Sequence, residues 1–443
     1  MGHFGALRTQ LGEMLRDRGS TGDMQSSSQG LRTLRRHRSE GVKLQHLLVL
    51  AALTVVVVVL TSCSSASGGS TYSDQIQAVD SFAEMTRPSI TVGTDGGGRL
   101  APNAVVEPGL PIVVSASRGA LTKVDIPTAS GRALAGSLSE DGSTWISTQP
   151  LGYSKQYSVR AEAVGVGGRM SVSQGFTTAS PETLTNAVIL GEKTVGIAQT
   201  IGVRFADPIP DRNKAQAAIT VTSDPQMQGA FYWISDSEVR WRPERFWTPG
   251  TKVNVAVNIY GVDLGDGLYG NGNLSYDFTI GRAQEIEADD KTKTIVVKRD
   301  GKVIRTMPTS FGKDSTPTPR GIYMIGDRVE HIIMDSSTYG VPVESSAGYR
   351  TPVDWAVQMS YSGIYMHGAP WSTAAQGNSN VSNGCPNLSP ADAEWLVKNT
   401  LRGDPVTVKN TNAERLSGVD GLGDWNIPWS QWKKGNANPR GFG

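Results

Sequence analysis

Residues 363–385 read GIYMHGAPWSTAAQGNSNVSNGC, and this stretch decides how the chain is interpreted. His367 ends the apolar run 364–366, which alternates like a strand and then enters a turn at Gly368. A strand end that enters a turn projects its side chain into a cleft. The small and polar loop 371–381 is expected to return the chain so that Cys385 faces His367.

Cys385 is predicted to be a nucleophile because nothing in the mature chain is left to pair with it. The chain has two cysteines, and Cys63 closes a short apolar run where export and lipid attachment would consume it. A free thiol has a pKa near 8.5, so an imidazole is needed to take its proton at neutral pH. After export only His331 and His367 remain, too few for a His/Cys zinc site.

The turn before the nucleophile predicts an oxyanion hole. Gly384 lets other backbone approach closely, and the N–H groups of Asn383, Gly384 and Cys385 are available as donors. Pro386 has no N–H and cannot contribute. One cysteine and one histidine eighteen positions apart form a permissive pattern, and the alternative is a buried cysteine that acts as a small hydrophobe.

The N-terminal residues predict an exported, anchored protein. Basic residues before position 45 precede the apolar run 47–60 (LLVLAALTVVVVVL), which is short for a membrane span but typical of a signal sequence. The small residues before Cys63 resemble a bacterial lipobox, and acylation there would tether the chain to the outer face of the cytoplasmic membrane. An uncleaved signal anchor is the alternative, and Met24 is an alternative start. The formal net charge of +1 gives no broad basic field for nucleic acid.

Residues from about 86 to 280 predict two β-sandwiches in tandem. Short alternating runs are separated by Gly, Pro and Asp turn signals, and a weak repeat of about a hundred residues places Trp145 and Trp241 at equivalent positions. Their aromatic residues are expected to lie in cores. The glycine-rich stretch 95–98 is read as a turn because no helix pattern follows it. Asp263, Asp266 and Gly267 form a candidate calcium loop with too few ligands, so a hairpin turn is favoured.

From Asp289 the pattern predicts a mostly β domain with one good helix. Runs 294–298 and 303–307 alternate around Asp300-Gly301, a strong hairpin signal. The helix is expected to have Ser389 as its N-cap and to stop at Gly403. Trp425, Trp429 and Trp432 follow in a tail that we expect to pack on this domain as a small subdomain.

The motifs His367-Gly368 and Ser382-Asn383-Gly384-Cys385 resemble the active-site signature of L,D-transpeptidases with the YkuD-type fold. Segments 307–310, 314–318, 333–340 and 423–429 are also similar to actinobacterial cell-wall members. The resemblance runs from about residue 110 to 435 and implies two immunoglobulin-like domains, a catalytic domain and a C-terminal subdomain. The expected boundaries are a signal and anchor segment 1–62, a flexible tether 63–85, immunoglobulin-like domains 86–179 and 180–282, a catalytic domain 283–409 and a subdomain 410–443.

The resemblance also implies a reaction and a set of site residues. Cys385 would attack a peptidoglycan tetrapeptide stem at its diaminopimelate, with release of D-alanine, and a second diaminopimelate amine would open the thioester to give a 3→3 cross-link. His367 would be the base, the Gly368 carbonyl would fix its tautomer, and no cofactor is needed. Carbapenems are expected to acylate the thiol. The residues implied to contact substrate or to form the flap over it are Tyr349, Ser362, Gly363, Ser382, Asn387, Met334, Tyr339 and Trp371.

Asn383 departs from the family pattern, which has a histidine before the Gly-Cys pair. The base and nucleophile survive, and the backbone N–H of Asn383 is kept. The departure leaves a non-catalytic wall-binding lipoprotein as an alternative. An L,D-carboxypeptidase that uses water as acceptor is another, and sortases rank last because no companion arginine motif is present.

Overall fold

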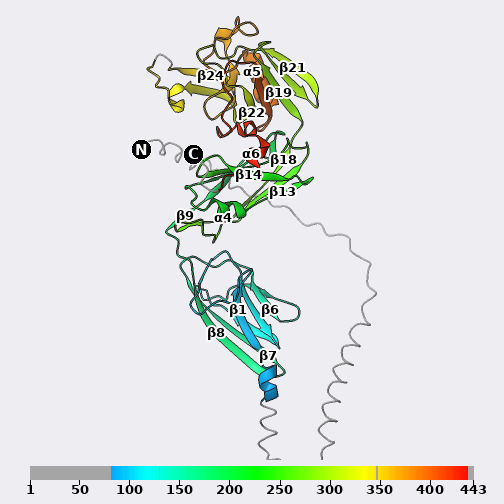
Figure 1. Ribbon diagram of the computed structural model, residues 1–443, viewed down its shortest axis with the longest axis vertical. Coiled ribbons are helices and arrows are strands. Elements are labelled where there is room, and N and C mark those ends of the chain that lie inside the picture. Colours follow the sequence, from blue (N-terminus) through cyan, green and yellow to red (C-terminus); the bar gives the residue numbers. More distant parts are fainter. Residues whose placement is uncertain (1–80, 129, 346–347, 438–443) are drawn as a thin grey trace, which may run out of the picture. The chain divides into compact units, whose positions relative to one another are not determined.

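The computed structural model describes residues 81–128, 130–345 and 348–437 (Figure 1). The predicted signal segment, Cys63 and most of the predicted tether therefore lie outside the described residues. Residues 81–86, at the end of the predicted tether, are helical instead, with the Thr86 hydroxyl donating to the Phe82 carbonyl at 2.7 Å. Within the described ranges we find no helix with the length and apolar character needed to span a membrane.

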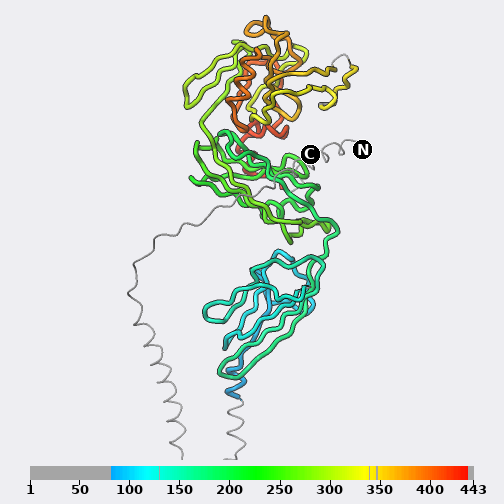
Figure 2. The backbone as a smooth tube through the Cα atoms, turned by 180° about the vertical axis from the view of Figure 1, so that it is seen from behind, coloured from blue at the N-terminus to red at the C-terminus, as the bar shows by residue number. Residues whose placement is uncertain are grey.

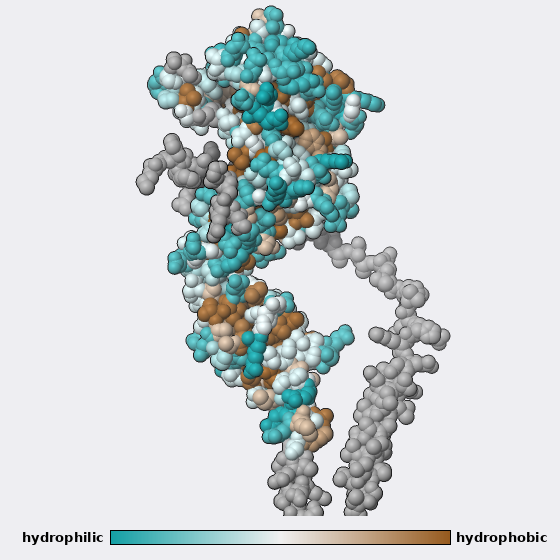
Figure 3. Space-filling model, viewed as in Figure 1, coloured by the Kyte–Doolittle hydropathy of each residue, from teal (hydrophilic) through white to brown (hydrophobic). Residues whose placement is uncertain are grey.

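The first sandwich consists of two four-stranded sheets, ordered β1-β3-β6-β5 and β2-β8-β7-β4. Its strands are β1 (Ser89–Thr94), β2 (Val105–Val106), β3 (Ile112–Ser117), β4 (Ala120–Asp125), β5 (Gly136–Leu138), β6 (Thr144–Ser147), β7 (Gln156–Gly165) and β8 (Gly168–Thr178). On the face shown in Figure 3, apolar side chains gather over this sandwich, whereas the C-terminal half of the chain is mostly covered by hydrophilic ones.

The second sandwich repeats this plan with sheets β10-β12-β15-β14 and β11-β18-β16-β13 and a short β17-β9 pair. Its elements are β9 (Thr183–Thr185), β10 (Ala187–Leu190), β11 (Thr194–Val195), β12 (Ile201–Phe205), α4 (Arg212–Ala217), β13 (Ile219–Asp224), β14 (Gly229–Trp233), β15 (Glu238–Pro243), β16 (Lys252–Val257), β17 (Leu268–Gly270) and β18 (Leu274–Ile280).

The predicted repeat is confirmed by its two tryptophans. Trp145 and Trp241 are both buried in the cores of their sandwiches. Each indole lies over a glycine of the neighbouring strand, and a Cβ at Gly136 or Gly229 would come within 2.1 or 2.2 Å of the ring. The same local solution, a tryptophan packed on a strand glycine, therefore occurs once in each sandwich.

The C-terminal half folds around two sheets, β21-β20-β19-β27-β22 and β23-β24-β25-β26. Its elements are β19 (Gln284–Asp289), β20 (Thr294–Arg299), β21 (Lys302–Pro308), β22 (Gly321–Met324), β23 (Arg328–Asp335), η1 (Ser336–Tyr339), β24 (Arg350–Gln358), β25 (Tyr365–Gly368), η2 (Pro370–Ser372), β26 (Asn387–Leu388), α5 (Pro390–Asn399), β27 (Pro405–Lys409), η3 (Asp424–Asn426) and α6 (Trp429–Trp432). Figure 2 shows the β23–β24 hairpin projecting from the rest of this half.

Local sequence signals placed two of these elements correctly. Asp300 and Gly301 both have positive φ, +50° and +76°, as the predicted tight hairpin requires. Ser389 caps α5 by accepting from the Asp392 N–H, with Pro390 in the first turn. The predicted end of this helix was wrong: α5 stops at Asn399, because Thr400 turns its hydroxyl back onto the Leu396 carbonyl.

The C-terminal tail packs on the C-terminal half, where the Asn426 side-chain amide donates to the Ile322 carbonyl at 2.8 Å, and it also packs on the second sandwich. Trp432 is fully buried and stacks on Tyr232 of β14 with ring centroids 5.1 Å apart. The Arg242 guanidinium of β15 lies 4.4 Å from the ring centroids of both Trp425 and Trp432. Burial lowers the Arg242 pKa to about 10, although Asp424 opposes the shift. The tail therefore joins the second sandwich to the C-terminal half.

Candidate active site

The backbone brings His367 and Cys385 together through one parallel strand pair. β25 and β26 run in parallel with His367 opposite Asn387, so the chain between them must return to the same edge of the sheet. The His367 N–H donates to the Pro386 carbonyl at 3.3 Å. The prediction that loop 371–381 returns the chain toward the histidine agrees with this arrangement.

The Cys385 thiol is buried in an apolar cluster beside Met334, Val353 and Tyr365. Its Sγ lies 3.6 Å from the Gly363 carbonyl, to which it donates, and accepts from the Tyr365 N–H at 3.4 Å. Burial raises the pKa of this thiol to about 11, and the Tyr365 N–H opposes that shift only in part. The Cys385 thiol is therefore protonated at neutral pH.

His367 is also buried, with 5% of its surface exposed. Its Nδ1 lies 3.0 Å from the Gly368 carbonyl, as predicted, so Nδ1 carries a hydrogen and Nε2 has the lone pair. Burial lowers the pKa of the imidazole, and the bond to Gly368 opposes the shift. The ring is therefore a neutral base at physiological pH. The Trp371 ring centroid lies 6.1 Å away.

Both groups line one cavity of about 420 Å³ between the β23–β24 hairpin and residues 381–385, which we term the nucleophile loop after the predicted role of Cys385. In the described residues the thiol hydrogen goes to Gly363 and the Nδ1 hydrogen goes to Gly368. The cavity is lined by Met334, Tyr349, Thr351, Val353, His367, Trp371, Ser372, Val381, Ser382, Asn383, Cys385 and Asn387. A bound acyl group can thus meet the sulfur and the imidazole from the same side.

The nucleophile loop corrects part of the predicted oxyanion hole. The Gly384 N–H donates to the Ser382 hydroxyl at 3.1 Å, so this amide is already engaged. Gly384 has φ +129°, where a side chain would be strained, and its carbonyl accepts from the buried Thr318 hydroxyl at 2.6 Å. Of the three amides predicted, those of Asn383 and Cys385 remain as candidate donors.

Most of the residues predicted to contact substrate line this cavity, and two of the described ones do not. Five of them do: Met334, Tyr349, Trp371, Ser382 and Asn387. Ser362 and Gly363 lie outside the lining, in the turn between β24 and β25, where the Gly363 carbonyl binds the thiol. Tyr339 ends η1, and its side chain lies outside the described residues.

Four lining residues were not predicted: Thr351, Val353, Ser372 and Val381. Thr351 and Val353 continue the alternation that begins at Tyr349, since every second residue of β24 faces the same side. That period-two pattern could have identified them. The Ser372 hydroxyl accepts from the Asn387 side-chain amide at 3.0 Å, a contact between η2 and β26 that no local pattern reveals.

The candidate calcium loop is used as a turn. Asp263 accepts from the Gly265 N–H at 2.9 Å and from Lys214 Nζ at 3.2 Å, so a lysine occupies the position a cation would take. The described residues contain no group of three or more His, Cys, Asp or Glu side chains arranged to hold a metal ion. Asp266 and Gly267, both at positive φ, complete the turn.

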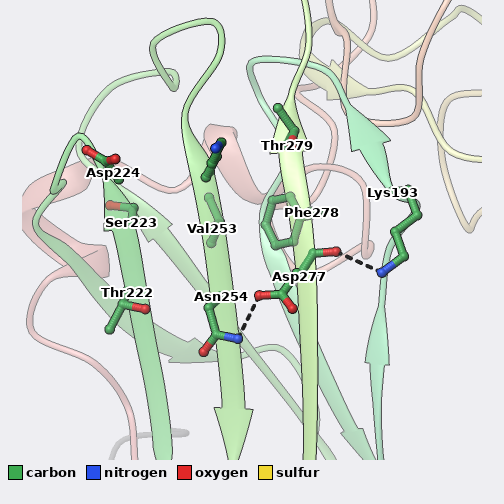
Figure 4. Close-up of a pocket in the computed structure, with 10 residues that line it drawn as sticks. Lys193, Thr222, Ser223, Asp224, Val253, Asn254, Asp277, Phe278 and Thr279 are labelled. Carbon is green, nitrogen blue, oxygen red and sulfur yellow. Dashed lines mark hydrogen bonds between the residues drawn. The ribbon is translucent and has the colours of Figure 1, made fainter. Parts of the chain in front are cut away.

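A larger cavity, of about 710 Å³, lies on the second sandwich away from this chemistry. Figure 4 shows its polar side chains standing on β13, β16 and β18, with Asn254 donating to Asp277 and Lys193 donating to the Asp277 carbonyl. Its lining contains neither cysteine nor histidine, so it offers no thiol and no imidazole base.

Comparison with known proteins is consistent with this site. Residues 283–408 match the family model of the YkuD L,D-transpeptidase catalytic domain, and residues 103–263 match that of a bacterial Ig domain. The chain is 47% identical over 394 residues to L,D-transpeptidase 2 of Mycobacterium tuberculosis, covering 88% of this chain and 95% of that protein. It is 35% identical over 348 residues to L,D-transpeptidase 5 of the same species, covering 76% of this chain and 75% of the relative.

A solved structure is also similar to part of the chain. It is the crystal structure of L,D-transpeptidase 3 from Mycobacterium tuberculosis in complex with a faropenem-derived adduct. The identity is 36%, the match covers 50% of this chain and 97% of the solved one, and the TM-score is 0.42. The sequence matches confirm the predicted fold class, an immunoglobulin-like region followed by a YkuD-type domain.

Proposed function

This chain belongs to the L,D-transpeptidase family, and we propose that it forms 3→3 cross-links in peptidoglycan through an acyl-enzyme on Cys385. The observation that supports the proposal most directly is that Cys385 and His367 line one cavity. The imidazole is held by the Gly368 carbonyl in the tautomer that leaves Nε2 able to accept a proton.

The first half of the reaction is acyl transfer to sulfur. Cys385 Sγ attacks the carbonyl carbon of the diaminopimelate at the third position of a tetrapeptide stem, and its proton passes to His367 Nε2. The negative charge on the carbonyl oxygen is stabilised by the N–H groups of Asn383 and Cys385. The C–N bond to the terminal D-alanine then breaks, and His367 returns the proton to the leaving amine.

The second half transfers the acyl group to a new amine. The side-chain amine of another diaminopimelate attacks the thioester carbonyl and loses a proton to His367. The C–S bond breaks, and the sulfur takes that proton back as the free thiol. Neither half requires a cofactor.

The electrostatics indicate when the proton moves. Burial raises the thiol pKa to about 11 and lowers that of the imidazole below its usual 6.5. Both shifts disfavour a resting thiolate–imidazolium pair, since each penalises the charged form of its group. Proton transfer therefore accompanies attack on a bound substrate, and the resting enzyme is protected from random oxidation.

The proposal extends to inhibitors and location. Carbapenems present a strained acyl group to the same thiol, and we expect a covalent adduct at Cys385. Acylation of Cys63 would anchor the chain to the outer face of the cytoplasmic membrane, within reach of the wall. The peptidoglycan stem, the membrane and the carbapenems are thus the proposed partners.

Product analysis with purified stem peptides tests the function. The chain without residues 1–63 is incubated with disaccharide-tetrapeptide, and the products are identified by mass spectrometry. A 3→3 dimer with released D-alanine, absent with Cys385→Ala, is the expected result. Tripeptide without dimer would instead indicate an L,D-carboxypeptidase, and binding without any product would indicate a wall-binding protein.

A further inference from the structure

A carboxylate of the C-terminal tail holds the turn that touches the nucleophile. Asp420 accepts from the Tyr361 N–H through Oδ1 at 2.8 Å and from the Ser362 N–H through Oδ2 at 3.0 Å. These are successive amides of the turn between β24 and β25. Hydrogen bonds from N–H groups to an ionised carboxylate are about twice as strong as neutral ones, so the pair is expected to fix the turn.

The same turn presents a carbonyl to the thiol. Gly363 has φ +98°, a conformation that glycine adopts without strain, and its carbonyl accepts from Cys385 Sγ at 3.6 Å. The Ser360 hydroxyl accepts from the Ile364 N–H at 2.8 Å and closes the turn from its other side. Displacement of the two bound amides would therefore move the carbonyl that orients the sulfur.

The tail is shaped to approach this turn closely. Gly421 follows the carboxylate at φ +106°, and a Cβ there would lie 2.3 Å from Cδ2 of Tyr361. The next residue, Leu422, is buried, and its carbonyl accepts from the Met324 N–H of β22 at 2.8 Å. The Leu422 carbonyl thus anchors the tail to the sheet that contains β22, and the lack of a side chain at Gly421 lets the tail lie directly against the turn.

We propose that Asp420 is a positioning residue for the nucleophile, which acts by holding the 360–363 turn so that the Gly363 carbonyl orients the Cys385 thiol. It lies 35 positions from the cysteine, on the tail that also binds the second sandwich. The inference rests on the proposed function only for the identity of the acylating substrate. The geometry around the sulfur does not depend on that identity.

Two reactions of the thiol test the proposal in Asp420→Ala, made in the chain without residues 1–63. Directed acylation by meropenem, followed by intact mass, is expected to slow about tenfold to a hundredfold at saturating inhibitor, because a poorly aligned nucleophile loses rate in the covalent step. Undirected alkylation by iodoacetamide at pH 7.5 is expected to accelerate at least about tenfold, because a loosened turn exposes the thiol and so reduces the burial that raises its pKa. Each pKa unit of return toward 8.5 raises the thiolate population tenfold.

Asp420→Asn and Asp289→Ala separate positioning from general destabilisation. Asparagine keeps one acceptor oxygen, so its acylation rate should fall between those of the wild type and Asp420→Ala. Asp289 also accepts from a turn amide, that of Lys291 at 2.9 Å, but lies outside the active-site cavity. Asp289→Ala should keep both wild-type rates even where its thermal stability falls equally.

The outcomes distinguish this inference from the proposed function. Wild-type rates of both reactions in Asp420→Ala would overturn the positioning role. Equal changes in Asp420→Ala and Asp289→Ala at matched stability would also overturn it. A wild-type chain that meropenem does not acylate would count against the proposed function, while the alkylation rates would still decide the role of Asp420.

Discussion

Removal of one buried hydroxyl is predicted to disrupt the nucleophile loop. Thr318 is fully buried, donates to the Gly384 carbonyl at 2.6 Å and accepts from the Gly312 N–H at 3.0 Å. Thr318→Val keeps the shape of the side chain and removes only the polar atom. Both backbone groups then lose the partner that the structure gives them.

The magnitude follows from the cost of buried polar groups without partners. Each such group costs about 1–3 kcal/mol, so the two together predict a loss of about 2–6 kcal/mol. Thr316→Val is the matched control, because Thr316 is only half-buried and its hydroxyl donates to the Ser382 carbonyl at a longer 3.3 Å. That control should lose less than about 1 kcal/mol.

Native-state hydrogen exchange of peptides covering 309–318 and 380–388 gives the local opening free energy. A local probe is needed because the described residues form several separate cores, and a single unfolding transition is not expected. Meropenem acylation of Thr318→Val should slow by about tenfold or more, since the Gly384 carbonyl is part of the nucleophile loop. Equal opening free energies and equal acylation rates in the two variants would refute the reasoning.

Four further predictions concern the protonation of Cys385, the protonation of His367, the docking of the tail and the Asn383 departure. Because its folded pKa is raised to about 11, Cys385 stabilises the fold below the ordinary thiol pKa near 8.5 and loses this contribution as the pH rises toward 11. The rate of its alkylation by iodoacetamide should therefore keep increasing toward pH 11. His367, whose pKa is lowered, stabilises the fold above pH 6.5 and loses this as the pH falls, so unfolding at pH 5 should be less pH-sensitive in His367→Gln. Trp432→Ala removes a fully buried ring that stacks on Tyr232 and should cost about 3–5 kcal/mol in calorimetry of the second sandwich. Asn383→His should change meropenem acylation less than about tenfold, because His367 remains the base; a larger gain in rate would show that residue 383 takes part in proton transfer.

Local chemistry explains which parts of the fold the sequence predicts. The Asp300-Gly301 hairpin and the Ser389 cap are set by neighbouring residues, and the tryptophan repeat by composition and spacing. The meeting of His367 and Cys385 was also predictable, because a strand end and a short return loop leave the chain few routes.

The remaining features depend on contacts between distant segments. The thiol bonds to Gly363, twenty-two positions away, and the Gly384 carbonyl bonds to Thr318, sixty-six positions away. The hydrogen bond from the Tyr361 N–H to Asp420 joins residues that are nearly sixty positions apart. No periodicity or turn signal encodes such pairs. The sequence also could not reveal that the Gly384 N–H donates to the Ser382 hydroxyl, because this hydrogen bond depends on the rotamer of the serine side chain.

Intact-mass spectrometry with meropenem tests the central claim most directly. The claim is that the Cys385 thiol, with His367 as its base, accepts an acyl group in the shared cavity. It predicts a single adduct on the wild-type chain without residues 1–63, none on Cys385→Ala, and one that forms far more slowly on His367→Gln. An adduct that persists in Cys385→Ala, or an undiminished rate in His367→Gln, would contradict it.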